Sequence, residues 1–130
     1  MKFECRFYDG QFLPIVLMGL NGKHGWFQCR VYIDTGASYS LFHADVAEML
    51  GISLEEGQPH EVTVGDGNTL KVFLHKVKVS LAGQEFEATI GFSNGLGIGF
   101  HILGRKTIFD KFVISFNEKE KYIEFTPLLK

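Results

Sequence analysis

Apolar and polar residues alternate in short runs along most of the chain, which is typical of half-buried β-strands. Residues 12–20 and 26–34 are two such runs, separated by Asn21-Gly22-Lys23-His24-Gly25. An Asn-Gly pair readily adopts the positive φ angles of a tight turn. These runs therefore predict a β-hairpin whose second strand ends at Ile33-Asp34.

A second hairpin is predicted where residues 61–65 and 69–81 alternate in the same way. They flank the turn sequence Gly65-Asp66-Gly67-Asn68. Because two glycines give this tip unusual backbone freedom, we expect it to be mobile and to act as a lid.

The rest of the chain adds shorter elements. Further strands are predicted at 85–92, 100–103, 112–116 and 122–125. Residues 44–50 show helical spacing and are followed by Gly51, a residue that commonly ends a helix, and a helical turn is expected at 107–111. With about eight strands and one or two short helices, the predicted fold class is mostly β.

Composition narrows the class of protein. The 130 residues contain no linker or repeat, so residues 1–130 are expected to form a single domain. A net charge of −2 leaves no cationic excess for binding nucleic acid or an anionic membrane. No apolar run is long enough to cross a bilayer, which favours a cytoplasmic protein.

The residue types that usually hold metals or disulfides show no suggestive spacing. Cys5 and Cys29 are the only cysteines, and we expect two buried free thiols. The five histidines form no metal-binding motif, so no metal or cofactor is predicted. Trp26 and the 13 phenylalanines are expected to fill the core.

The segment with the clearest chemical potential is Asp34-Thr35-Gly36-Ala37-Ser38, directly after the apolar strand Val31-Tyr32-Ile33. A carboxylate at the end of a buried strand is costly unless it is hydrogen-bonded or partnered. Two interpretations follow from these residues alone. Asp34 either shapes a turn or caps the next segment, or it performs chemistry.

Three segments together resemble the retropepsin-like aspartic proteases, in particular their single-domain cellular and bacterial branch. They are residues 31–38, the glycine turn Gly65-Asp66-Gly67-Asn68, and Ile102-Leu103-Gly104-Arg105. In that family an apolar-apolar-Asp-Thr-Gly loop, a flap and an apolar-apolar-Gly segment occur in this order. The match extends from about residue 16 to 125.

The resemblance implies a small closed β-barrel that hydrolyses peptide bonds without a metal or cofactor. Asp34 would be the catalytic carboxylate, Thr35 would bond across to its counterpart, and residues 62–72 would close over a peptide or protein substrate. Ser38 stands where viral members commonly have an acid that pairs with the arginine of the apolar-Gly segment. The partner of Arg105 is therefore left open.

The chemistry of such a reaction requires two carboxyl groups. One takes a proton from water while the other gives a proton to the carbonyl oxygen. None of the other aspartates lies in a second apolar-Asp-Thr/Ser-Gly loop; they are Asp9, Asp45, Asp66 and Asp110. The second carboxylate is therefore expected from a second copy of the chain, in a homodimer.

Two alternatives belong to other functional classes. A non-catalytic peptide-binding or dimerisation module would keep the fold without the activity. A monomeric small-ligand barrel would require Asp34 to be merely a turn residue. The physiological substrate, the cleavage preference and excision from a longer precursor are not specified by the sequence.

Overall fold

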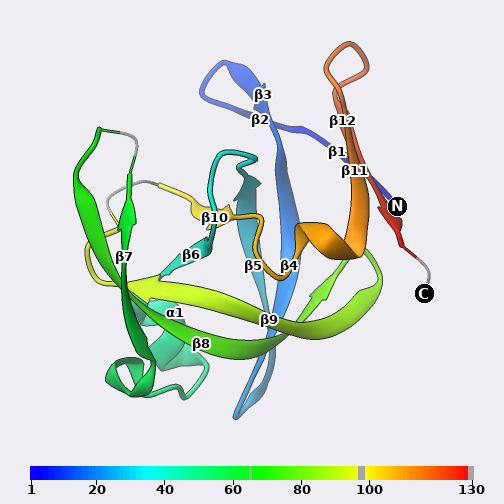
Figure 1. The fold of residues 1–130 in the computed structure, drawn as a ribbon. Helices are drawn as coiled ribbons and strands as arrows, with labels where there is room; N and C mark the ends of the chain where they lie inside the picture. Colours follow the sequence, from blue (N-terminus) through cyan, green and yellow to red (C-terminus); the bar gives the residue numbers. More distant parts are fainter. Residues whose placement is uncertain (65, 97–98, 129–130) are drawn as a thin grey trace.

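Strands dominate the computed structural model, which describes residues 1–64, 66–96 and 99–128 (Figure 1). The strands are β1 (Lys2–Glu4), β2 (Arg6–Tyr8), β3 (Gln11–Leu13), β4 (Ile15–Gly22), β5 (Gly25–Ile33), β6 (Ser40–His43), β7 (Gln58–Thr63), β8 (Thr69–Leu81), β9 (Gln84–Ser93), β10 (His101–Leu103), β11 (Phe112–Asn117) and β12 (Tyr122–Pro127). The helices are α1 (Ala44–Met49) and the short 3-10 turns η1 (Leu54–Glu56) and η2 (Phe109–Lys111). The predicted mostly-β class is confirmed.

The largest sheet closes on itself. Its strands follow the order β4-β5-β10-β6-β9-β8-β7, and β4 also pairs with β8. This extra pairing joins the first strand to the sixth, so the sheet curls into a ring around one apolar core. Fully buried side chains from several of these strands fill the interior, among them Met18, Leu20, Phe42, Ile90 and Phe92.

Both predicted hairpins form. Strands β4 and β5 pair through Asn21↔Trp26 and Gly22↔Gly25, and β7 pairs with β8 from Gln58↔Leu74 to Thr63↔Thr69. The predicted helix also forms, and it ends before Gly51, which has a φ of +75°.

Two parts of the N-terminal region differ from the predicted strands. Strand β1 joins β12 and β11 in a separate three-stranded sheet, and β2 and β3 form a two-stranded hairpin of their own. Phe12 lies in β3, so the predicted strand over 12–20 begins only at Ile15. Strand β6 was also missed. Each of these strands has only three or four residues, too few for an alternating pattern to be visible.

The expectation that aromatic residues fill the core is wrong for part of the set. Trp26 is 41% exposed, and Phe7 and Phe12 are 65% and 48% exposed. Cys5 and Cys29 are free thiols but only partly buried. Among the described residues, no helix has the length and apolar character that a membrane span needs.

Candidate active site

Asp34 lies at the first residue after β5, in a loop that its own side chain helps to shape. The carboxylate Oδ1 accepts a hydrogen bond from the Gly36 amide at 2.9 Å, and the Asp34 carbonyl accepts one from Ala37 at 3.1 Å. The Asp34 amide donates to the Leu103 carbonyl at 3.0 Å. Asp34 therefore shapes the turn, and its Oδ2 atom has no protein partner among the described residues.

Strand β10 holds this loop from behind. It runs parallel to β5, with Ile102 opposite Tyr32, and antiparallel to β6, with Ile102 opposite Leu41. The apolar-Gly segment thus lies between the strand that enters the Asp34 loop and the strand that leaves it.

Gly104 lets the chain pass very close to the loop. A Cβ atom at this position would overlap the backbone carbonyl of Tyr39 and lie 2.8 Å from the Ser40 amide nitrogen. The Gly104 amide donates to the buried Ser40 hydroxyl at 2.9 Å. Two more backbone bonds follow, from Arg105 to Ala37 at 2.9 Å and from Lys106 to Ser38 at 2.7 Å. We call this set of contacts between residues 103–106 and the Asp34 loop the buttress.

The predicted flap is the turn between β7 and β8, which extends from the ring at the left of Figure 1. Val64 and Asn68 are linked by a backbone bond of 2.9 Å, and Gly67 has a φ of +87°. The Asp66 carboxylate accepts hydrogen bonds from the Asn68 amide and side chain at 2.9 and 3.0 Å. These bonds lower the pKa of Asp66 below its ordinary value. Gly65, also predicted for the flap, lies outside the described residues.

A cleft of about 580 Å³ separates the loop from the flap. Asp34 lines it from the loop, Asp66 from the flap and Ile102 from the apolar-Gly segment, so the three predicted segments do meet. The remaining lining residues are Gly36, Ala37, Leu41, Thr63, Val64, Leu70 and Leu96.

Several predicted site residues lie beside this cleft and do not line it. Thr35 is exposed at the tip of the loop. Leu103 and Gly104 are buried behind the loop as parts of the buttress. Gly67 and Asn68 shape the flap turn.

Ser38 and Arg105 share an outer hollow of about 470 Å³ with Asp110. Within residues 1–64, 66–96 and 99–128, the guanidinium of Arg105 has no ion pair or hydrogen bond, and Asp110 pairs with Lys111 at 3.4 Å. The buttress therefore uses the backbone of Arg105 and no acid after the loop.

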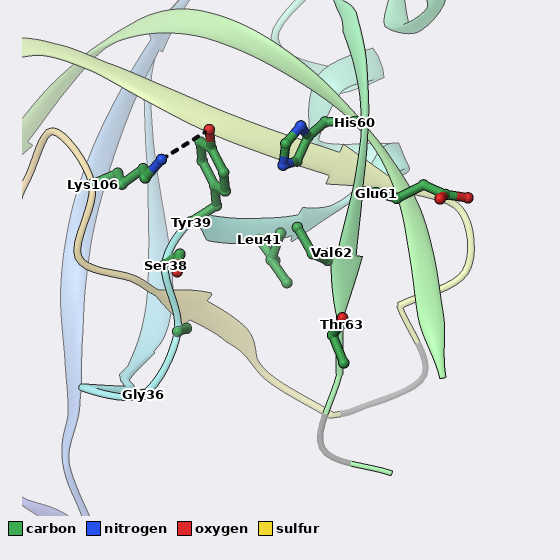
Figure 2. A pocket seen from close by; sticks show the side chains of 10 residues that line it. Gly36, Ser38, Tyr39, Leu41, His60, Glu61, Val62, Thr63 and Lys106 are labelled. Carbon is green, nitrogen blue, oxygen red and sulfur yellow. Dashed lines mark hydrogen bonds between the residues drawn. The ribbon is translucent and has the colours of Figure 1, made fainter. Parts of the chain in front are cut away.

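A second hollow of about 370 Å³ adjoins the cleft (Figure 2). Tyr39 stands between Lys106 and His60: its hydroxyl lies 3.4 Å from the Lys106 ammonium, and its ring centroid lies 5.1 Å from that of His60. Glu61 also borders the hollow, but its carboxylate points away from it in Figure 2. Sequence reasoning missed these residues because they become neighbours only when β7 folds over the loop.

Among the described parts of the chain, no three histidine, cysteine or acidic side chains come together in a way that would hold a metal ion. The arrangement offers instead one carboxylate with a free oxygen, at the floor of a cleft that is covered by a hairpin.

Comparison with known proteins places this arrangement in context. Residues 18–93 match the sequence profile of a family described as aspartyl protease. A retropepsin-like aspartic protease from Rickettsia conorii is 19% identical, with a TM-score of 0.67 over 96% of this chain and 90% of that one. The EIAV protease complexed with the inhibitor HBY-793 is 21% identical, with a TM-score of 0.57 over 81% of this chain and 93% of that one. No curated protein sequence matches the chain. The likeness of the two structures establishes a retropepsin-like fold.

Proposed function

The chain belongs to the aspartyl protease family, and on this premise we propose that it is an aspartic endopeptidase, active as a homodimer with Asp34 of each copy in one shared site. The observation that carries the proposal is the position of Asp34. Its carboxylate lies on a loop that is fixed by the buttress, and it lines a cleft that the flap covers.

The proposed reaction is the attack of water on a peptide carbonyl. One carboxylate takes a proton from the water, whose oxygen bonds to the carbonyl carbon, while the other carboxylic acid donates a proton to the carbonyl oxygen. The tetrahedral intermediate then breaks at the C–N bond: the carboxyl group that took the proton from water gives it to the leaving amine, and the other carboxylate takes back a hydroxyl proton as the carbonyl re-forms. Two carboxyl groups that share one proton are needed throughout.

Asp66 is the only other carboxylate among the described residues that line the cleft, and it is poorly suited to be the second member of the pair. Its two oxygens already accept hydrogen bonds from Asn68, and these bonds lower its pKa. A group that is held in its ionised form is a poor proton donor. A second Asp34, brought in by a two-fold axis, is the better candidate.

The substrate we propose is an extended stretch of peptide between the loop and the flap. The cleft is lined mainly by aliphatic residues, whereas the adjoining hollow contains the polar side chains of Tyr39, His60 and Lys106. We therefore expect apolar side chains next to the cleaved bond, and a polar or charged side chain one or two positions away.

The test compares the wild-type protein with Asp34→Asn on a fluorogenic peptide library across pH. Two close carboxylates lose their protons in separate steps, so kcat/KM of the wild type should follow a bell-shaped profile with an acidic optimum. Asp34→Asn keeps the size of the side chain but loses the ionisable group, and kcat/KM should fall at least about 1,000-fold.

Asp45→Asn, at an exposed position in the first turn of α1, is the matched control and should keep full activity. Cleavage by purified Asp34→Asn would contradict the assignment of the catalytic group. A wild-type protein that binds a pepstatin-type inhibitor or peptides but cleaves none would instead favour the non-catalytic peptide-binding module.

A further inference from the structure

The hairpin formed by β2 and β3 has two different faces. Phe7 and Phe12 are direct cross-strand partners, so their side chains lie on the same face. Tyr8 is on the other face, where its ring packs edge-on against Phe100 with 5.1 Å between centroids. The Tyr8 face therefore contacts the body of the protein through Phe100, although Tyr8 itself is 56% exposed, and the Phe7 side borders a hollow that is also lined by Ile15 and Leu17.

The Phe7–Phe12 face is apolar and largely exposed, with the Lys121 ammonium at its edge, 5.9 Å from the Phe12 ring centroid. Phe7 is 65% exposed and Phe12 is 48% exposed, and they contact each other with 5.1 Å between ring centroids. A two-stranded hairpin is only marginally stable by itself, and adjacent exposed aromatic rings often mark a contact surface.

This hairpin is attached directly beside the catalytic loop. Strand β3 ends at Leu13, and the carbonyl of the next residue, Pro14, accepts a 2.9 Å hydrogen bond from Ile33, the residue before Asp34. Phe100 also lies against Tyr32, at 6.1 Å between centroids. In Figure 1 the hairpin extends from the same end of the molecule as the loop between β5 and β6.

We propose that the Phe7–Phe12 face is covered by a second copy of this chain when the active dimer forms. The inference rests on the proposed function, because that function requires two Asp34 carboxylates to meet across a two-fold axis. The axis must then pass close to Asp34, and the hairpin that carries Phe7 and Phe12 is anchored beside Asp34 by the bond between Pro14 and Ile33. Aromatic residues at the centre of an interface commonly contribute most to its affinity.

The test measures the dimer dissociation constant by sedimentation for the wild type and for Phe7→Ser/Phe12→Ser. The double variant should raise this constant at least about 30-fold, as expected for the loss of a central aromatic pair. Peptide cleavage should be lost at low protein concentration and recover at high concentration, with an unchanged kcat per dimer. Recovery of cleavage at high concentration would show that the variant forms its dimer less tightly but keeps an intact active site.

The matched control is Trp26→Ser/Met49→Ser, which removes two large side chains of similar exposure, 41% and 50%, from β5 and α1. Its dissociation constant should stay within about twofold of the wild type, as is usual for surface changes outside an interface. Thermal unfolding of both double variants shows whether the fold is kept.

A second measurement does not depend on any variant. Hydrogen exchange of the β2 and β3 amides in the wild type should slow when the protein concentration rises above the dissociation constant. A dimer whose affinity is the same in Phe7→Ser/Phe12→Ser, or whose hairpin exchanges equally fast in monomer and dimer, overturns this inference and leaves the proposed function standing. A wild type that cleaves peptides as a strict monomer overturns both.

Discussion

The Asp34 loop and the flap face each other across one cleft, yet they are held in opposite ways. The loop is tied to residues 103–106 by backbone bonds that come from distant parts of the sequence, and a buried hydroxyl, that of Ser40, takes part. Among the described residues, the hydrogen bonds of the flap turn all lie within it, between Val64, Asp66, Gly67 and Asn68. The proposed catalytic group therefore sits on the more firmly held side of the cleft, and the turn that we expect to move lies on the other side.

One glycine on each side shows the difference. At Gly104 the backbone conformation is ordinary, but there is no space for a side chain. At Gly67 there is space, since a Cβ atom at this position would meet nothing within 4 Å, but φ is +87°. The first glycine is required by packing and the second by the turn.

The largest effect is expected from Gly104→Ala. The new methyl group would overlap the Tyr39 carbonyl, so the loop and β10 must separate, and the free energy of unfolding should fall by about 3 kcal/mol. Denaturant unfolding measures this change. Peptide cleavage should fall as well, because the position of Asp34 depends on the same contacts.

The control for this experiment is Gly99→Ala, where a Cβ atom would meet nothing within 4 Å. Equal free energies of unfolding for the two variants would mean that the contacts around Gly104 rearrange at little cost. The Asp34 loop would then not be held more firmly than the flap.

A smaller effect on stability is expected from Gly67→Ala. The left-handed backbone costs a non-glycine residue about 1 kcal/mol, and there is no clash to add to this cost. Because the flap closes over the peptide in the proposed reaction, kcat/KM should fall more than the stability does.

Gly83→Ala is the matched control, with a φ of +79° in the β8–β9 turn. It should lose a similar amount of stability and keep its activity. If both variants cleave equally well, the turn at Gly67 has no role in catalysis.

Local patterns in the sequence predicted the three segments around the cleft better than they predicted the contacts that hold these segments. The Asp-Thr-Gly loop, the flap turn and the apolar-Gly segment each carry local signals, and they meet at one cleft as the resemblance implied. The contact of Gly104 with Tyr39 joins two distant parts of the chain, and no local pattern shows such a contact.

The missed elements share a physical cause. Strands β1, β2 and β3 have three residues each, and Phe7 and Phe12 are exposed where an average aromatic residue would be buried. Periodicity measures which face of an element is apolar, but not whether that face meets the core of its own chain. The two rings therefore looked like core residues in the sequence.

The smallest predicted effect is on how local stability depends on pH, which should differ between the loop and the flap. His101, in β10 behind the loop, has its pKa lowered by burial and then by the nearby His43, while Asp45 acts in the opposite direction. The ring nitrogen Nδ1 lies 3.4 Å from the His43 amide and accepts from it only when unprotonated. Since the folded pKa is below the unfolded value of about 6.5, the unfolded chain binds a proton that the folded chain does not. This contribution to stability is complete above about pH 6.5 and declines as the pH falls towards the lowered value.

The hydrogen bonds of the flap turn should weaken only at a lower pH than the contacts behind the loop. The pKa of Asp66 is lowered from its ordinary value of 3.8, mainly by the bonds from Asn68, so these bonds persist when the pH falls through the range in which His101 begins to matter. Their contribution is lost only as the pH falls below 3.8 towards the lowered value. Between about pH 6.5 and about pH 4, the contacts behind the loop should weaken while the flap turn does not.

Hydrogen exchange, expressed as opening free energies at about pH 7 and about pH 5, on either side of the ordinary histidine pKa, tests this order of events. The β10 and β6 amides of the wild type should open more easily at the lower pH, whereas the Asn68 amide should not change. His101→Gln should remove the pH dependence in β10 and β6, and His24→Gln, in the exposed β4–β5 turn, should leave it as in the wild type. A pH dependence that survives in His101→Gln would assign the weakening to another group. Equal weakening of both regions would mean that the two sides of the cleft respond as one unit, against the division of roles inferred from their hydrogen bonds.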